Sequence, residues 1–380
     1  MKDILIGYDA KRIARNATGL GNYCRTLVAD MSALLPQCRL RLYMPDLGRA
    51  QLLGQLPEAQ NIEFALPQSA RSAAAKALWR SWGVTRQLAL DGVKIYHGLS
   101  GELPLGLRRA GIPAVATVHD LIFMRHPEYY NRIDVAFYRL KFRAMCREAG
   151  RIIAISECTK RDIMELGGVE ESRIDVVYQS CAPRFTTEVA DELCLRARSE
   201  LQLPPRYILN VGTVEQRKNV MLALDALTLL PDDLHLVVVG RPTAYADKLR
   251  QRAQKLGLAA RLHLLSGVGN DILPAVYHMA ETFVYPSRYE GFGLPIIEAI
   301  QSGLPVVACT GSCLEEAGGP DSLYVGPDDV NGMADAIKTT LQNGAERTAR
   351  IGRSREWVRR FENTNTAAKV AGVYEKLLGE

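Results

Sequence analysis

The sequence lacks long apolar runs, cysteine pairs and any strong excess of one charge sign. No apolar stretch approaches the ~18 residues that a membrane-spanning helix requires. The opening residues, Met1–Gly7, are too few and too quickly polar for a signal peptide. The eight cysteines form no Cys-x-x-Cys pair, so neither a zinc site nor a redox motif is indicated. We therefore expect a cytoplasmic protein whose cysteines are reduced core thiols.

Several catalytic signatures are absent as well. The chain has no Asp-x-Asp pair, so no carboxylate clamp for Mg²⁺ or Mn²⁺ is visible and we expect no metal requirement. It also has no Gly-x-x-x-x-Gly-Lys-Ser/Thr and no Gly-x-Ser-x-Gly segment. These absences argue against a P-loop ATPase and against an α/β-hydrolase.

The 380 residues are 47% hydrophobic and 23% charged, an ordinary globular composition of a length that predicts two domains. The net charge of +5 is unevenly divided. Residues 1–150 hold 21 Lys+Arg and 12 Asp+Glu, net +9, whereas residues 151–380 hold 26 and 30, net −4. A basic N-terminal half favours an anionic partner such as a membrane surface or a phosphorylated ligand, with chance as the alternative. No motif supports a nucleic-acid partner.

Short apolar runs alternate with helical segments, and the series restarts after a break near 183–205 that contains several prolines. This alternation predicts an α/β fold with two Rossmann-like, doubly wound parallel-sheet domains. We place them at 1–185 and 186–365, with a last helix in 366–380 that crosses back to the N-terminal domain. The predicted strands are Ile4–Tyr8, Leu40–Met44, Ile95–His97, Ala114–Val118, Arg151–Ile155, Ile174–Tyr178, Tyr207–Val211, Leu234–Val239, Leu262–Leu264, Glu281–Tyr285, Pro305–Cys309 and Ser322–Val325.

Two turns after predicted strands have features of anion sites. In Asn16–Tyr23, Gly19 and Gly21 let the backbone approach a ligand before a helix that we expect from about Gly21. Cys24 stands where the dinucleotide fingerprint needs a third glycine, so this is not an NAD site, and a merely structural turn is equally consistent. In Gly212–Asn219, Arg217 and Lys218 precede a helix with Asn219 as its expected N-cap, an arrangement suited to a diphosphate.

The most specific segment is Tyr285–Ala299, in which Glu290 and Glu298 lie eight positions apart. Gly291 and Gly293 expose backbone N–H groups before a helix that we expect Pro295 to start. Glu298 would then lie in its first turn. Carboxylates accept from sugar hydroxyls and glycine amides donate to oxygens, so this segment favours a hydroxyl-rich ligand.

Among the six histidines, His119 is placed best for function because it directly follows the apolar strand Ala114–Val118. A residue at the carboxyl end of a parallel strand faces the ligand crevice. A buried core histidine is the alternative. His97 also lies at the end of a strand, and its functional reading is weaker.

Together these segments resemble the retaining glycosyltransferases of family 4, which have the two-domain GT-B fold with a nucleotide-sugar cleft between the domains. The resemblance covers nearly the whole chain and is greatest to bacterial mannosyltransferases that build O-antigen and other surface polysaccharides. The motifs that carry it are Thr18–Tyr23, Val118–Asp120, Ile155–Glu157, Val211–Thr213 with Arg217–Asn219, Tyr285–Val307 and Cys313–Gly318.

The resemblance implies an N-terminal acceptor-binding domain and a C-terminal domain that binds the nucleotide-sugar. Arg217 and Lys218 would neutralise the leaving diphosphate. Many relatives have a further Arg where this chain has Thr213, so more of the diphosphate charge would be neutralised by Arg217 and Lys218. Glu290 would hold the donor sugar, Glu298 the ribose, and His119 would lie near the anomeric carbon. Further donor contacts would come from Gly21, Gly212, Val268, Gly291, Phe292, Gly293 and Leu294.

The implied donor is GDP-mannose and the implied acceptor a lipid-linked sugar or an oligosaccharide. GDP-rhamnose, UDP-sugars and dTDP-sugars are alternative donors. Two other functions fit the same architecture, a non-hydrolysing sugar-nucleotide epimerase and an inactive nucleotide-sugar-binding subunit. Peripheral contact with the inner face of the cytoplasmic membrane is one interpretation of the segment 71–88. Its basic and tryptophan residues are Arg71, Lys76, Trp79, Arg80, Trp82 and Arg86. A buried amphipathic helix with a solvated basic edge is the other.

Overall fold

The computed structural model describes residues 3–68, 72–362 and 365–379, and they divide into two compact units. Unit 1 comprises Met1–Gln179 and Thr364–Glu380, and unit 2 comprises Ser180–Asn363. The expected division lay at 185/186, so the two differ by a few residues in the linker. None of the helices in the described residues is long and apolar enough to cross a membrane.

Unit 1 is built on a parallel sheet with the strand order β3-β2-β1-β4-β5-β6-β7. Its strands are β1 (Leu5–Asp9), β2 (Arg39–Tyr43), β3 (Ile62–Ala65), β4 (Ile95–Gly98), β5 (Ala114–Val118), β6 (Arg151–Ala154) and β7 (Ile174–Val176). Its helices are α1 (Lys11–Arg15), α2 (Gly19–Leu34), α3 (Ala50–Leu53), α4 (Ala73–Leu78), α5 (Val84–Asp91), α6 (Ile122–Arg125), α7 (Arg132–Glu148), α8 (Glu157–Gly167) and α17 (Thr366–Leu378), with a π turn over Trp79–Gly83.

Unit 2 repeats the plan with the strand order β10-β9-β8-β11-β12-β13, again parallel. Its strands are β8 (Tyr207–Val211), β9 (His235–Val239), β10 (Leu262–Leu265), β11 (Thr282–Tyr285), β12 (Val306–Cys309) and β13 (Leu323–Val325). Its helices are α9 (Asp191–Leu201), α10 (Val220–Ala226), α11 (Tyr245–Lys255), α12 (Leu273–His278), α13 (Leu294–Gln301), α14 (Leu314–Gly318), α15 (Val330–Leu341) and α16 (Ala345–Val358). The predicted fold class, two doubly wound parallel sheets, is confirmed.

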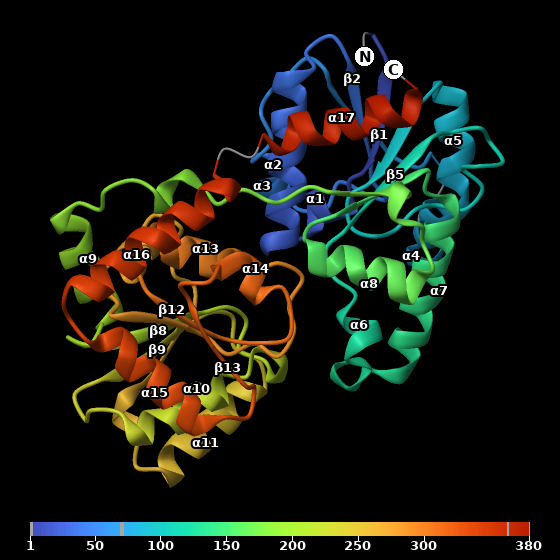
Figure 1. Cartoon of the computed structure of the whole chain (residues 1–380). Coiled ribbons are helices and arrows are strands. Elements are labelled where there is room, and N and C mark those ends of the chain that lie inside the picture. The colour runs from blue at the N-terminus through green and yellow to red at the C-terminus, as the bar shows by residue number, and fades with distance from the viewer. Residues whose placement is uncertain (1–2, 69–71, 363–364, 380) are drawn as a thin grey trace. The chain divides into compact units, whose positions relative to one another are not determined.

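The last helix, α17, packs on unit 1, where Figure 1 shows it in red beside the blue α2. Its apolar side chains Val370, Val373 and Tyr374 are buried in the same core as Ile6 and Val28. Burial of such side chains contributes about 1.5–3 kcal/mol each, which holds the end of the chain against the sheet that its beginning forms.

Candidate active site

The order of strands in unit 2 reverses between β8 and β11, since β9 and β10 lie on one side of this pair and β12 and β13 on the other. In open parallel sheets, ligands bind beyond the carboxyl ends of the strands at such a switch point. Gly212–Asn219 follows β8 and Ser287–Glu290 follows β11. The two motifs that are far apart in the sequence therefore meet at one edge of the sheet.

At this edge, one carboxylate contacts two cations. Glu290 Oε1 lies 2.6 Å from Lys218 Nζ and 2.9 Å from Arg217 Nη1. The Glu290 side chain is only 10% exposed, and those of Arg217 and Lys218 are 14% and 11% exposed. Three of the residues predicted to act on the donor thus form one buried cluster, which we call the Glu290 cluster.

Neighbouring groups fix both cations in place. Arg217 donates from Nη1 to the backbone oxygen of Tyr289 at 2.7 Å and from Nη2 to Glu215 Oε1 at 2.7 Å. Lys218 donates to the Tyr285 hydroxyl at 2.7 Å, and its Nζ lies 4.9 Å from the centre of that ring. Such fixed donors are suited to an anion because little reorganisation is needed when charge develops on it.

The charges of the cluster are set by burial and by mutual attraction. Burial alone would raise the pKa of Glu290, but Lys218 and Arg217 outweigh it and lower that pKa to about 2. Burial would likewise lower the pKa of Lys218, yet Glu290 outweighs it and the pKa is raised. Tyr285 has its pKa raised to about 12, mainly by burial. At neutral pH the cluster therefore contains two cations, one carboxylate and a neutral phenol.

The glycine-rich turn after Glu290 leads into α13, and its backbone conformation depends on one glycine. Gly293 is the N-cap of α13 with φ 120°, and a Cβ placed there would lie 3.1 Å from the Ala317 Cβ. The helix starts at Leu294, so Pro295 is its second residue and not its first. The first N–H groups of a helix have no partner within that helix, which makes this end a place for oxygen acceptors.

Glu298 lies in the second turn of α13, not in the first as predicted, because the helix starts one residue earlier and its first turn contains no acidic residue. Its Oε2 accepts a hydrogen bond from the Tyr277 hydroxyl at 3.0 Å. Burial raises the pKa of Glu298 to about 7, and the hydrogen bond from Tyr277 and the nearby Arg184 offset only part of that effect. Glu290 and Glu298 thus occupy different environments, one stably ionised and one close to its titration point.

The other residues predicted to bind the donor lie on loops of the same unit. Gly212 follows β8 with φ 155°, next to the Lys218 side chain. Val268 is half-buried in the loop after β10. Phe292 is 3% exposed and packs edge-on against Phe361, with ring centroids 5.2 Å apart, so its side chain belongs to the core. Gly291 and Leu294, on either side of it, are half-buried.

Asn219 does not cap α10 with its side chain as predicted. It occupies the N-cap position with φ 53°, but its Nδ2 donates to the backbone oxygen of Pro327 at 2.8 Å. The left-handed backbone places Asn219 between the turn of Gln216–Lys218 and the helix, and the side chain then reaches the loop after β13.

Gly21 and His119 belong to unit 1. Helix α2 starts at Gly19, two residues before the predicted start, so Gly21 lies in its first turn. A Cβ at Gly21 would come within 1.8 Å of the Asn16 backbone oxygen, which only glycine avoids. The Gly21 N–H points to the Asn16 side chain, with Oδ1 at 3.3 Å, so this turn is stabilised internally.

His119 follows β5 as expected, and both ring nitrogens have partners. Nε2 lies 2.9 Å from the Leu99 carbonyl oxygen, and Nδ1 lies 3.2 Å from Gln179 Nε2. The ring packs edge-on against Tyr23, with centroids 4.7 Å apart. Burial lowers the pKa of His119 to about 4. The imidazole is therefore neutral and oriented at neutral pH, with Nε2 as the donor to the carbonyl oxygen.

His97 was predicted, less firmly than His119, to lie at the ligand crevice. Its side chain does not face a crevice. It is fully buried, its Nδ1 lies 2.6 Å from the Tyr374 hydroxyl, and its Nε2 lies 2.8 Å from Thr117 Oγ1. Burial lowers its pKa to about 3. A residue in a strand points to one face of the sheet, and this one points to the face that α17 covers.

Sequence reasoning missed the tyrosines of the site. Tyr285 hydrogen-bonds Lys218, and Tyr277 hydrogen-bonds Glu298. Both are buried aromatic residues in apolar segments, and nothing in the sequence separates them from ordinary core residues.

No group of three or more His, Cys, Asp or Glu side chains that could hold a metal ion is found in residues 3–68, 72–362 and 365–379.

The chain is similar to known glycosyltransferases along most of its length. Residues 17–180 match the family model Glycosyltransferase Family 4, and residues 194–357 match the model Glycosyl transferases group 1. The O-antigen chain mannosyltransferase B of Escherichia coli is 29% identical over 376 residues, covering 95% of this chain and 96% of that protein. The O-antigen chain mannosyltransferase RfbU of Salmonella typhimurium is 28% identical over 226 residues, 60% of each chain.

Among solved structures, the Anabaena protein Alr3699/HepE in complex with UDP and glucose superposes with a TM-score of 0.76. It is 16% identical and covers 99% of this chain and 100% of that one. At this level of identity the likeness concerns the fold alone. With the two family matches and the relative that spans nearly the full length, it follows that the chain belongs to the family 4 glycosyltransferases and has the GT-B α/β fold.

Proposed function

We propose that this glycosyltransferase transfers mannose from GDP-mannose, with retained anomeric configuration, to a lipid-linked or oligosaccharide acceptor in surface polysaccharide biosynthesis. The observation that supports it most is the Glu290 cluster, in which two fixed cations lie at the switch point of a parallel sheet. A diphosphate is the leaving group that such a cation pair suits. The mannose assignment draws on the two relatives named as O-antigen chain mannosyltransferases.

In the proposed reaction, the bond between the anomeric carbon and a diphosphate oxygen breaks. A bond between that carbon and an acceptor oxygen forms on the same face of the sugar, and the acceptor proton passes to the leaving diphosphate. Arg217 and Lys218 stabilise the negative charge that develops on the leaving oxygens. These cations replace a metal ion in the proposal, so transfer should persist in the presence of a chelator.

In the same proposal, Glu290 binds hydroxyl groups of the donor sugar and Glu298 binds those of the ribose. Gly21 lies near the diphosphate. His119 acts as a hydrogen-bonding group near the donor sugar and not as a base, because burial lowers its pKa to about 4.

Thermal stabilisation by a panel of nucleotides and their sugars tests the donor. A ligand that binds only the native state raises the melting temperature by mass action. We expect shifts with GDP and GDP-mannose, unchanged by EDTA, and none with UDP or dTDP compounds. A shift with UDP or dTDP compounds instead would overturn the mannose assignment. Isomerisation of the donor in the absence of acceptor would indicate an epimerase, and no shift with any nucleotide would favour a non-catalytic subunit.

Replacement of Lys218 tests the role of the cations. Lys218→Ala should lower turnover roughly 10²–10³-fold, as loss of a preorganised donor at a developing charge does. Lys248→Ala, an exposed lysine on α11 of the same unit, is the matched control and should leave turnover unchanged. Circular dichroism of both variants checks the fold. Wild-type turnover in folded Lys218→Ala would rule out this role.

A further inference from the structure

The sheet of unit 1 has a switch point of its own, and the proposed reaction does not use the two carboxylates that lie there. The strand order reverses between β1 and β4, since β2 and β3 lie on one side of this pair and β5, β6 and β7 on the other. Asp9 is the last residue of β1, and Glu102 lies in the loop after β4. Ligands of open parallel sheets bind beyond the carboxyl ends of the strands at such a point.

A cavity of about 310 Å³ lies at this switch point. Its walls come from the end of β1, the π turn after α4, β4 with the loop after it, and α7, which lies beside α4 in Figure 1. Its aromatic lining residues are Trp82, Tyr96 and Phe137. Ligand pockets span about 300–1,000 Å³, so this volume is at the small end and suits a single ring better than a nucleotide-sugar.

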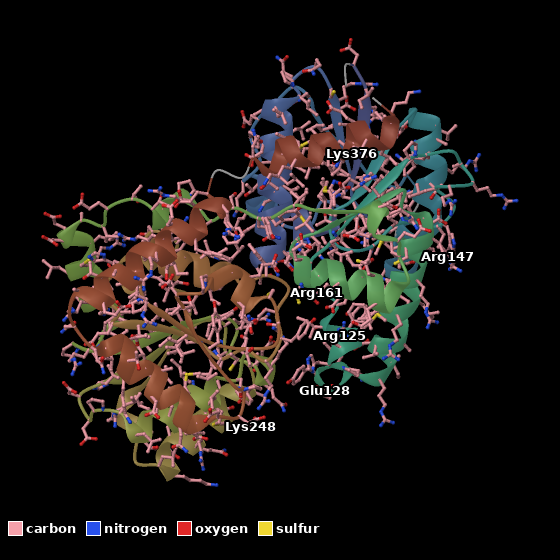
Figure 2. All side chains as sticks on the ribbon, viewed as in Figure 1. Arg125, Glu128, Arg147, Arg161, Lys248 and Lys376 are labelled. Carbon is pink, nitrogen blue, oxygen red and sulfur yellow. The ribbon has the colours of Figure 1, made fainter. Side chains whose placement is uncertain are left out.

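The charged residues of the cavity neutralise one another. Arg80 forms ion pairs with Asp9 and Glu102, and Lys141 Nζ lies 3.0 Å from Glu102 Oε2. Lys141 thus turns to the cavity, whereas Arg147, further along α7, projects from the helix in Figure 2. Burial would raise the pKa of Glu102, but Arg80 and Lys141 outweigh it and lower that pKa to about 2. With two cations and two carboxylates, the lining has no net charge and suits an uncharged ligand.

These ion pairs bear on the interpretation of the segment 71–88 as a membrane contact. Arg80 is not a surface cation, because its side chain is 14% exposed and lines the cavity. Lys76 pairs with Asp46 at 2.9 Å, and Arg71 lies outside the described residues. The segment therefore supplies a wall of the cavity, and two of its cations have carboxylate partners within unit 1.

Two polar groups of the cavity have no hydrogen-bond partner among the residues that the structure describes. Glu102 contacts both of its cations through Oε2, which leaves Oε1 without a hydrogen bond. The Tyr96 hydroxyl forms none either, although Tyr96 is only 2% exposed. The hydroxyl of Tyr43, equally buried on β2, donates to Asp91 Oδ2 at 2.7 Å. A buried hydroxyl without a partner costs free energy, so Tyr96 is suited to a ligand that supplies one.

We propose that this cavity binds one uncharged sugar ring of the acceptor. The inference rests on the proposed function, because it presupposes a glycan acceptor, and it adds the part that unit 1 recognises, a neutral sugar and not a phosphate. Hydroxyl groups of the sugar donate to Glu102 Oε1 and accept from the Tyr96 hydroxyl. Trp82, which is 56% exposed, and Phe137 provide flat apolar surfaces for the C–H groups of the ring.

Other occupants fit the cavity less well. A phosphate group has only acceptor oxygens when ionised and would meet the negative charge of Glu102, while both cations already have carboxylate partners. A lipid chain would leave Glu102 Oε1 and the Tyr96 hydroxyl buried without partners, which costs free energy.

Saturation-transfer NMR of the full-length protein tests the proposal. The probes are the methyl α-glycosides of mannose, glucose, galactose and N-acetylglucosamine at millimolar concentration, with inorganic pyrophosphate as an anionic competitor. We expect at least one glycoside to bind and pyrophosphate not to displace it. Tyr96→Phe should weaken binding roughly two- to tenfold, as loss of one hydrogen bond does. Trp82→Ala should weaken it roughly tenfold through loss of the apolar surface.

Matched controls come from the same unit. Tyr96→Phe removes a hydroxyl that has no partner among the described residues, so its melting temperature should not fall. Tyr43→Phe breaks the hydrogen bond to Asp91, so it should lower the melting temperature and leave glycoside binding unchanged. Leu78→Ala alters a side chain that is 56% exposed like Trp82 but does not line the cavity, and it should bind glycosides like the wild type.

Equal glycoside binding by Tyr96→Phe, Trp82→Ala and the wild type, or no binding by the wild type, would overturn the proposal. Displacement of the glycosides by pyrophosphate would assign the cavity to an anionic group instead. The thermal shift with GDP tests the donor site separately and should be equal in all variants. Glycoside binding that Tyr96→Phe weakens, without any GDP shift, would contradict the donor assignment and leave this inference standing.

Discussion

At the scale of single residues, Glu290 has two roles. It neutralises Lys218 and Arg217 in the structure, and in the proposed reaction it must also hold the sugar. A diphosphate that enters beside these cations meets the negative charge of Glu290 as well. The carboxylate therefore opposes tight binding of the leaving group, while it positions the part of the donor that reacts.

Glu290→Gln separates these effects. GDP should bind at least as tightly as to the wild type, because one anion near the diphosphate is removed. Turnover should fall roughly 10²–10³-fold. The free protein should lose about 3 kcal/mol of stability, because buried Lys218 loses its carboxylate partner and Arg217 keeps only Glu215. Calorimetry with GDP, transfer kinetics and thermal melts measure the three quantities. Glu215→Gln, which removes only the half-exposed partner of Arg217, is the control. Weaker GDP binding with unchanged turnover would contradict the proposed role.

The raised pKa of Glu298 predicts that donor binding depends on pH. Its pKa is raised to about 7 in the free protein, so the carboxyl is largely protonated below that pH and ionised above it. Hydroxyl groups donate to the ionised form, so affinity should rise with pH. Between about pH 6 and about pH 8 the ionised fraction changes roughly tenfold, and affinity for GDP-mannose should follow. Glu298→Gln should flatten the profile. A slope that persists in this variant would assign the titration to another group.

At the scale of elements, α13 depends on the glycine at its start. Gly293→Ala forces a side chain into φ 120° and to within 3.1 Å of Ala317. We expect a loss of about 1–3 kcal/mol and weaker GDP binding, because the turn between Glu290 and Glu298 must shift. Gly352→Ala in α16 meets no atom within 4 Å and should stabilise the protein by about 0.5–1 kcal/mol. Thermal melts with and without GDP compare the two variants, and equal behaviour would contradict the argument.

The elements were largely predictable because alternation of apolar strands and amphipathic helices is a local property of the chain. The strand β3 (Ile62–Ala65) was missed, since it is an edge strand whose side chains are mostly half-buried or exposed and which has no continuous apolar run. The contact of Glu290 with Lys218 was not predictable, because it arises from the order of strands and not from either motif. The start of α13 differed by one residue, and that shift moved Glu298 into another turn.

At the scale of the whole molecule, the chain returns to its first unit through α17. The Tyr374 hydroxyl is buried between His97 Nδ1, at 2.6 Å, and the Tyr8 hydroxyl, at 3.3 Å. His97 also hydrogen-bonds Thr117, so this network joins the last helix to three strands of the unit 1 sheet. The stability of unit 1 therefore depends on residues that follow unit 2 in the sequence.

Tyr374→Phe should reveal this dependence. The variant keeps the ring but leaves His97 Nδ1 without its partner, which costs about 1–3 kcal/mol. Hydrogen exchange should quicken in β1, β4 and β5 and stay unchanged in β8–β13, and GDP should bind unit 2 with wild-type affinity. Tyr138→Phe, in which the altered ring is 38% exposed on α7, is the control and should leave exchange unaltered. Faster exchange in both units of Tyr374→Phe would mean that they unfold as one cooperative structure, and α17 would then stabilise the whole molecule rather than its first unit alone.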